Sequence, residues 1–168
     1  AALAMNKRLA DTLGAAQSLH NLGYFQWRLG RIADAIASYE EALTILADPV
    51  PGKTPADQSH AYVECLTGYA SLLSSADRLP ESAAAYERLV PILRREFPEE
   101  AFAPTLRRQA RICTQLDRHA DAAAALEELL DIHARIKGPE HADTLAVRAE
   151  LREVRRRLES PESAPDPR

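Results

Sequence analysis

Five histidines are the side chains of this sequence best suited to acid–base or metal chemistry: His20, His60, His119, His133 and His141. His60 and Glu64 are four residues apart, so on a helix they would lie on one side and could share a metal ion. Two ligands do not complete a metal site, and a solvated polar helix face is the simpler interpretation. His133 and His141 flank the segment 137–139, where loop and helix-capping roles are commoner than metal binding. The sequence therefore predicts no metal site.

No catalytic motif joins these residues to one another. The chain contains no HExxH zinc motif and no Gly-rich phosphate loop. The pairs Ser59–His60 and Ser74–Ser75 show no pattern of a nucleophile, a base and an orienting acid. We therefore expect no enzymatic activity and no cofactor.

The composition indicates a helical protein with an acidic balance. Ala, Leu, Glu and Arg dominate the 168 residues and favour helices, whereas aromatic residues make up only 5%. The formal net charge of −4 argues against a primary nucleic-acid role, and no apolar run is long enough to cross a membrane. We therefore expect an all-α cytoplasmic protein that binds neither nucleic acid directly nor membranes.

Two cysteines, Cys65 and Cys113, fall on the apolar stripes of two different predicted helices. Two small buried hydrophobic side chains in a reducing cytosol are the simpler interpretation. A disulfide or a redox pair is the alternative, and no short cysteine spacing favours metal binding.

A unit led by an arginine recurs three times, at Arg31, Arg78 and Arg118, with spacings of 47 and 40 residues. Each arginine is followed after four residues by a small one, after eight by a large apolar or aromatic one, and after eleven by another apolar one. In chain order these sets are Ala35, Ser82 and Ala122; Tyr39, Tyr86 and Leu126; Ala42, Leu89 and Leu129. Such self-similarity is the signature of a solenoid, in which each unit buries its apolar face against its neighbours.

Proline, glycine and polar stop signals divide the chain into segments. The prediction is a half-repeat over 1–14, repeat one over 15–50, repeat two over 56–96, repeat three over 101–136, a capping helix over 139–159 and a disordered tail over 160–168. The segment 48–55 holds three prolines and a glycine, which predicts a loop. Pro91 falls within an apolar stripe and is expected to kink or end its helix.

The first part of the chain is predicted to form two helices, over about 1–9 and about 15–29. In the second of these, Leu19, Leu22, Phe25 and Leu29 fall on one face.

The chain resembles the tetratricopeptide repeat family. The first unit carries the resemblance most clearly, through Leu22, Gly23, Gly30, Ala35, Tyr39, Ala42 and Leu43. The later units share the small positions and the large apolar or aromatic positions, but have Ala70 and Ala110 in place of Gly23, and Asp77 and Asp117 in place of Gly30. The spacing exceeds the family's usual 34 residues, as in the long repeats of kinesin light chains and bacterial regulators. The resemblance implies a right-handed α-solenoid of antiparallel helix pairs.

The chain also has features of a fragment. Residues 1–13 are similar to the second helix of an earlier repeat, and position 1 is not a methionine. We therefore expect a C-terminal piece of a longer protein. In similar bacterial proteins such arrays follow a nucleotide-binding or DNA-binding module.

In this family the first helices of successive units line a concave groove that binds protein segments. The resemblance therefore implies these groove residues: Gln17, His20, Asn21, Tyr24, Trp27 and Arg28 in the first unit; Glu64, Thr67, Gly68 and Ser71 in the second; Arg107, Arg108 and Arg111 in the third. An asparagine at the position of Asn21 binds the ligand backbone in similar repeats. No matching asparagine stands at Gly68 or Arg108.

Two of these assignments have alternatives. Trp27 either packs on an adjacent helix and is partly exposed, or anchors a ligand in the groove. The three arginines either pair with an acidic peptide or form a solvated face that Glu99 and Glu100 balance.

Three functions fit the sequence. The first is a non-catalytic scaffold that binds a protein or peptide, an acidic one if the arginines take part. The second is a ligand-sensing regulatory domain of a larger signalling or transcription regulator, with the N-terminal remainder of its own chain as a partner. The third is an oligomerisation module, in which exposed faces at the ends of the array pair between chains.

Overall fold

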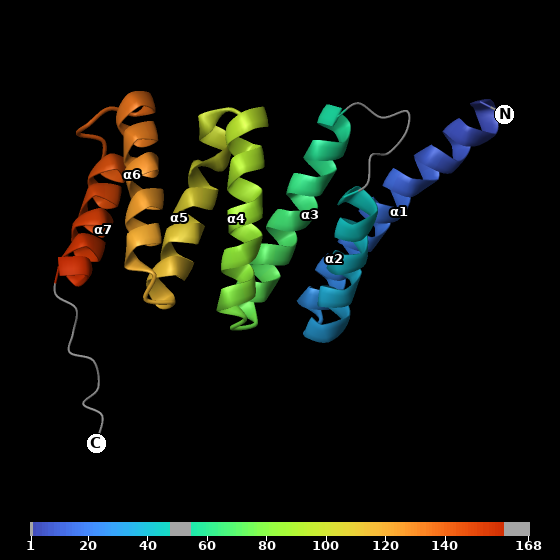
Figure 1. Cartoon of the computed structure of the whole chain (residues 1–168), viewed down its shortest axis with the longest axis horizontal. Coiled ribbons are helices and arrows are strands. Elements are labelled where there is room, and N and C mark those ends of the chain that lie inside the picture. Colours follow the sequence, from blue (N-terminus) through green and yellow to red (C-terminus); the bar gives the residue numbers. More distant parts are fainter. Residues whose placement is uncertain (1, 48–54, 160–168) are drawn as a thin grey trace, which may run out of the picture. The chain divides into compact units, whose positions relative to one another are not determined.

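Seven helices and no strand make up the described residues, 2–47 and 55–159, of the computed structural model (Figure 1). The helices are α1 (Ala2–Arg28), α2 (Ile32–Ala47), α3 (Pro55–Ser75), α4 (Leu79–Glu96), α5 (Glu99–Gln115), α6 (His119–Ile136) and α7 (Ala142–Glu159). The all-α prediction is confirmed. Residues 48–54 of the predicted loop and the predicted tail over 160–168 lie outside the described residues. Pro55, which the prediction placed in that loop, instead begins α3.

The helices belong to two compact units, Ala1–Glu96 and Phe97–Arg168. In the first unit α1 and α2 form an antiparallel pair, as do α3 and α4, and α3 packs on both α2 and α4 (Figure 1). The first helices of the two pairs, α1 and α3, also contact each other. In the second unit α6 packs between α5 and α7.

Two predicted helix breaks are absent from the structure. The chain from Ala2 to Arg28 is one helix, because Gly14 weakens a helix by only about 1 kcal/mol and no proline follows to end it. The predicted separate helix over about 1–9 is therefore wrong. Helix α4 also continues past Pro91, so it does not end there. The proline is exposed.

One turn geometry joins the two helices of every pair. Gly30, Asp77 and Asp117 all have a left-handed backbone, with φ of 75°, 59° and 57°. The N–H group of the next residue, an arginine each time, donates to the carbonyl group five residues earlier at 2.9, 2.9 and 2.8 Å. Aspartate replaces glycine in the later turns because it tolerates this conformation better than most residues.

The repeated arginine closes the start of each second helix. Its side chain binds an acidic residue three positions later, and the pairs are Arg31–Asp34 at 2.7 Å, Arg78–Glu81 at 2.9 Å and Arg118–Asp121 at 2.7 Å. These pairs are exposed, so each adds little to stability, but together they explain why arginine recurs. The sequence pattern identified the arginines without the acidic residues.

Replacement of Asp77 tests the turn geometry. Asp77→Ala should lower the free energy of unfolding by about 0.5–1 kcal/mol, because alanine pays the steric cost of the left-handed region without aspartate's local hydrogen bonding. Asp77→Gly, the matched control, should be at least as stable as the Ala variant. Urea denaturation of both variants measures the difference, and a more stable Ala variant would contradict the assigned turn.

The ring of Tyr39 lies between the backbones of α1 and α3. A Cβ atom on Gly23 of α1 would stand 3.0 Å from Tyr39 Cδ2, and one on Gly68 of α3 would stand 2.8 Å from Tyr39 Oη. Both glycines therefore leave the space that the ring fills. The resemblance places Gly68 in the groove, but the structure turns it toward Tyr39.

The small and large positions of the three units are buried as the pattern predicts. Ala35, Ser82 and Ala122 are each 0% exposed, which allows the paired helices to approach closely. Tyr39, Tyr86, Leu126, Ala42, Leu89 and Leu129 are also buried. The burial confirms that the two cysteines are small core residues, and it raises the pKa of the Cys65 thiol to about 12.

Gly68→Ala tests the packing of Tyr39. The added methyl group would overlap the ring, so this variant should lose about 1–3 kcal/mol of unfolding free energy. Gly14→Ala is the control, because a Cβ atom there meets nothing within 4 Å. That substitution in α1 should be neutral or stabilising by about 0.5–1 kcal/mol. Equal stability of the two variants in chemical denaturation would show that the ring does not lie against Gly68.

Candidate functional site

The candidate residues of the first two repeats lie in the same compact unit of the structure. We call one surface of this unit the α1–α3 face. It consists of exposed and half-buried side chains of two helices: Gln17, His20, Asn21 and Tyr24 of α1, and Glu64, Thr67 and Ser71 of α3. Its position follows from the core, because Tyr39 holds α1 and α3 against each other.

His20 and Glu64 connect the two helices of this face. The His20 ring meets the edge of Tyr39, with ring centres 5.6 Å apart. Partial burial lowers the pKa of His20, and the negative charge of Glu64 opposes that shift, so the two side chains lie within electrostatic reach. The Nδ1 atom of His20 is buried and has no hydrogen-bond partner among the described residues. Glu64 also lies 3.5 Å from His60 on its own helix.

The polar groups of the α1–α3 face retain hydrogen-bonding capacity. The side-chain amide group of Gln17 donates to the side-chain oxygen Oδ1 of Asn21 over a long 3.5 Å. The described residues provide no acceptor for the Asn21 side-chain NH₂ group. The Thr67 and Ser71 hydroxyl groups donate to carbonyl groups of their own helix, at 2.7 and 2.8 Å. The oxygen lone pairs of Thr67 can still accept from a ligand.

Aromatic side chains border this face on α1. Tyr24 is 44% exposed, and its ring makes an edge contact with Trp27 at 6.5 Å between centres. Trp27 is half-buried, as its first interpretation requires, although this ring contact is to its own helix. Arg28 is exposed beside them.

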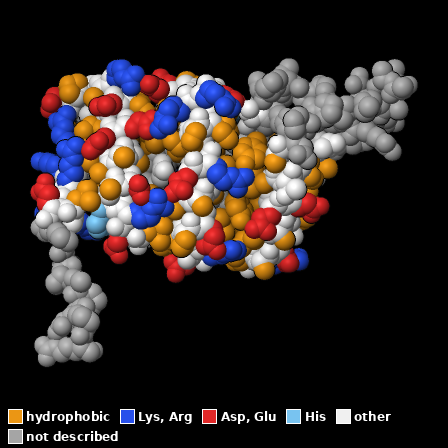
Figure 2. Space-filling model, in the orientation of Figure 1, with side chains coloured by type: hydrophobic (Ala, Val, Ile, Leu, Met, Phe, Trp, Pro, Cys, Tyr) orange, Lys and Arg blue, Asp and Glu red, His pale blue; other side chains and the backbone are white. Residues whose placement is uncertain are grey.

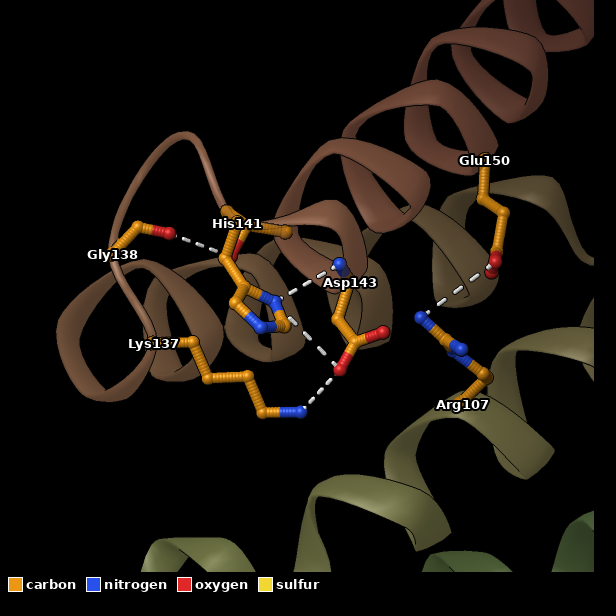
Figure 3. Close-up of polar contacts among 7 residues, drawn as sticks. Arg107, Lys137, Gly138, His141, Asp143 and Glu150 are labelled. Atoms are coloured by element: carbon orange, nitrogen blue, oxygen red, sulfur yellow. Dashed lines mark hydrogen bonds and ion pairs between the residues drawn. The ribbon is translucent and has the colours of Figure 1, made fainter.

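The three candidate arginines of α5 belong to the third repeat and to the second compact unit. Their surroundings differ. Arg107 is half-buried and pairs loosely with Glu150 of α7 at 3.8 Å (Figure 3). Its Nε and Nη2 atoms are shielded from solvent and make no hydrogen bond within the described part of the chain. Arg108 and Arg111 are exposed. Glu99 binds Arg135 of α6 at 2.9 Å.

The segment between α6 and α7 is held by capping contacts. The Asp143 N–H group donates to His141 Nδ1 at 3.2 Å, and the His141 N–H group donates to the Gly138 carbonyl group at 3.3 Å (Figure 3). Lys137 binds the Asp143 carboxylate at 2.5 Å and lowers its pKa. The capping interpretation of His141 is therefore confirmed.

The arginines of α7 make ordinary surface pairs. Arg156 and Arg157 bind Glu153 on the same helix, and Arg155 binds Glu127 of α6 at 2.8 Å. Acidic and basic side chains intersperse over the described surface that Figure 2 draws. Within the described residues no group of three His, Cys, Asp or Glu side chains is placed to hold a metal ion. None of the described helices combines the length and apolar character needed to cross a membrane.

Repeated antiparallel helix pairs with small contact residues define an all-α helical-repeat protein. Residues 16–47 match the family model of the tetratricopeptide repeat. No curated protein matches the chain.

Three solved structures are similar to the chain. A putative kinesin light chain of Podosopora anserina, with nearly identical TPR-like repeats, has a TM-score of 0.62 and 19% identity over 85% of this chain and 66% of that one. The apo form of RapI has a TM-score of 0.67 and 14% identity over 88% and 51%. The first TPR of Spaghetti (RPAP3), bound to the HSP90 peptide SRMEEVD, has a TM-score of 0.58 and 16% identity over 88% and 95%.

These similarities show the fold alone, which is that of tetratricopeptide-like repeats. The chain spans about two thirds of the kinesin light chain structure and about half of RapI.

The lowered pKa of His20 predicts how stability depends on pH. The unfolded chain takes up a proton near pH 6.5, before the folded chain does, so stability should fall as the pH drops through that value. His133 acts in the same direction, because burial and the charge of Lys137 lower its pKa. Between about pH 7.5 and 5.5, the melting temperature of the His20→Gln variant should fall less than that of the parent. When His133→Gln is added, the fall should be smaller still. An unchanged slope in both variants would contradict this assignment.

Proposed function

We propose that the chain is a non-catalytic scaffold that binds an extended segment of a partner protein along the α1–α3 face. The observation that carries this proposal is the unused hydrogen-bonding capacity of the face. The Asn21 amide group lacks an acceptor among the described residues, although α1 and α3 are fixed by the core around Tyr39.

An extended peptide backbone is the ligand that suits these groups. Its N–H and C=O groups alternate, and the amide side chain of Asn21 offers both a donor and an acceptor. The Thr67 oxygen atom on the facing helix can accept from a peptide N–H group. Tyr24, at the border of the face, offers an aromatic surface to one apolar side chain of the segment.

A second, finer proposal concerns the second compact unit by itself: an acidic segment binds the arginines of α5. Arg111 is exposed on α5, and Arg107 has only a long contact of 3.8 Å to Glu150. Guanidinium groups pair with carboxylates through charge-assisted hydrogen bonds. The structurally similar repeat of RPAP3 is bound to a peptide, SRMEEVD, that contains acidic residues, which supports this preference.

The test begins with peptides selected from a random library against the full chain. For a selected peptide, Asn21→Ala should weaken binding about threefold to tenfold, which corresponds to one lost hydrogen bond of about 0.5–1.5 kcal/mol. Glu41→Ala, an exposed position on α2, is the control and should bind like the parent. Fluorescence anisotropy measures both affinities.

The acidic preference is tested separately with Arg111→Glu. This variant should weaken binding of acidic peptides more at low salt than at high salt, because exposed charges are screened over about 8–10 Å at physiological ionic strength. Binding that survives Asn21→Ala but is lost in Glu41→Ala would place the ligand on another face. An affinity that does not depend on salt would contradict the acidic preference alone.

A further inference from the structure

An apolar stripe on α1 is open to solvent. Leu22, Phe25 and Leu29 follow one side of the helix, and their exposed fractions are 48%, 63% and 74%. Ala15 and Ser18 continue the same side toward the N-terminus and are also exposed. Single exposed apolar residues are common, but three large ones in a row are typical of an interaction surface. Periodicity alone predicted this apolar face without showing whether anything covers it.

The corresponding side of α3 is a helix-packing surface. At the repeat spacing of 47 residues, Cys65, Tyr69 and Leu72 correspond to Ser18, Leu22 and Phe25. In α3 these side chains pack toward α2: the Cys65 thiol donates to the Tyr39 carbonyl group at 3.8 Å and the Tyr69 hydroxyl group donates to Glu40 at 2.8 Å. Leu72 is 0% exposed. The α1 stripe therefore has the position and composition of a surface that receives a helix.

We propose that the α1 stripe pairs with the same stripe of a second copy of this chain, with the two α1 helices antiparallel. The stripe is complementary to itself in that direction, because its large residues lie at one end and its small ones at the other. Leu29 of one copy then lies opposite Ser18 of the other, and Leu22 opposite Phe25. The Ser18 hydroxyl group already donates to the Gly14 carbonyl group at 2.7 Å, so its burial leaves no donor unsatisfied.

The charge distribution favours a second copy over a charged partner. Between Gly14 and Gly30 the sequence has one charged residue, Arg28, although 27% of the chain is charged. In the antiparallel pair Arg28 of one copy lies opposite the region of Leu19 in the other, so the two arginines do not meet. Antiparallel helix dipoles add no repulsion. A strongly acidic or basic partner would find no complementary charge on this stripe.

The pairing is modest in size and independent of the peptide-binding proposal. Three exposed side chains form a patch of a few hundred Å², below the roughly 800 Å² per partner of a stable interface. The dimer should therefore be reversible and depend on concentration. His20 lies about 160° around the helix from Leu22, so pairing leaves that part of the α1–α3 face open.

Sedimentation of the full chain tests the dimer directly. The mass should rise from the 18.5 kDa of one chain toward twice that value as concentration increases. Phe25→Lys combined with Leu29→Lys should weaken association at least tenfold and leave the helical spectrum unchanged, because both side chains are exposed. Leu158→Lys, at a residue of α7 that is 44% exposed, is the matched control and should associate like the parent. A monomer at every concentration, or an equal effect of both changes, would overturn the proposal.

Cross-linking tests the antiparallel direction. A mixture of the Ser18→Cys and Leu29→Cys variants, treated with a mild oxidant, should give a covalent dimer, whereas neither variant alone should. Cys65 and Cys113 are buried in the core and should not compete. Dimers formed by each single variant alone would indicate a parallel pair, and no covalent dimer from the mixture would also contradict the proposal.

Discussion

The contact of the Tyr39 ring with two glycine backbones is the interaction on which the first unit depends. Gly23 of α1 and Gly68 of α3 leave the space that the ring fills, and a Cβ atom at either position would stand within 3.0 Å of it. The ring therefore sets how closely the two first helices approach the second helix between them. Burial raises the pKa of Tyr39 to about 12, so the ring stays neutral where it packs. The positions of His20, Asn21 and Glu64 follow from this contact.

The second and third repeats have the same turn and the same buried small position as the first repeat, with different side chains around them. Each turn uses a left-handed residue followed by an arginine that binds an acid three positions later. Each second helix has a fully buried small residue four positions after that arginine. Because local bonds hold the turns and small residues hold the helix contacts, the outward positions of the first helices can vary. This separation between frame and surface suits a scaffold whose specificity lies in exposed side chains.

The sequence predicts the buried positions of the second helices well because these positions recur periodically. The small, aromatic and apolar positions after Arg31, Arg78 and Arg118 are all buried, since every unit meets the same packing constraint. Local signals were less reliable: Gly14 does not interrupt α1, and Pro91 on an exposed face does not end α4. The contact of Gly68 with Tyr39 joins residues 29 positions apart, and the Arg135–Glu99 pair joins residues 36 apart, so only the fold could reveal them. Ligand binding by the face remains a proposal, because neither pattern nor geometry contains the ligand.

Proton–proton contacts of the Tyr39 ring show directly whether the ring packs between Gly23 of α1 and Gly68 of α3. In a nuclear Overhauser spectrum of the full chain with labelled tyrosine and glycine, the ring protons should show cross-peaks to the α protons of both Gly23 and Gly68. Those two contacts would place α1 and α3 on either side of the ring, as the α1–α3 face requires. Cross-peaks to one glycine only, or to neither, would contradict the account, because the two first helices would then not be held by a common side chain.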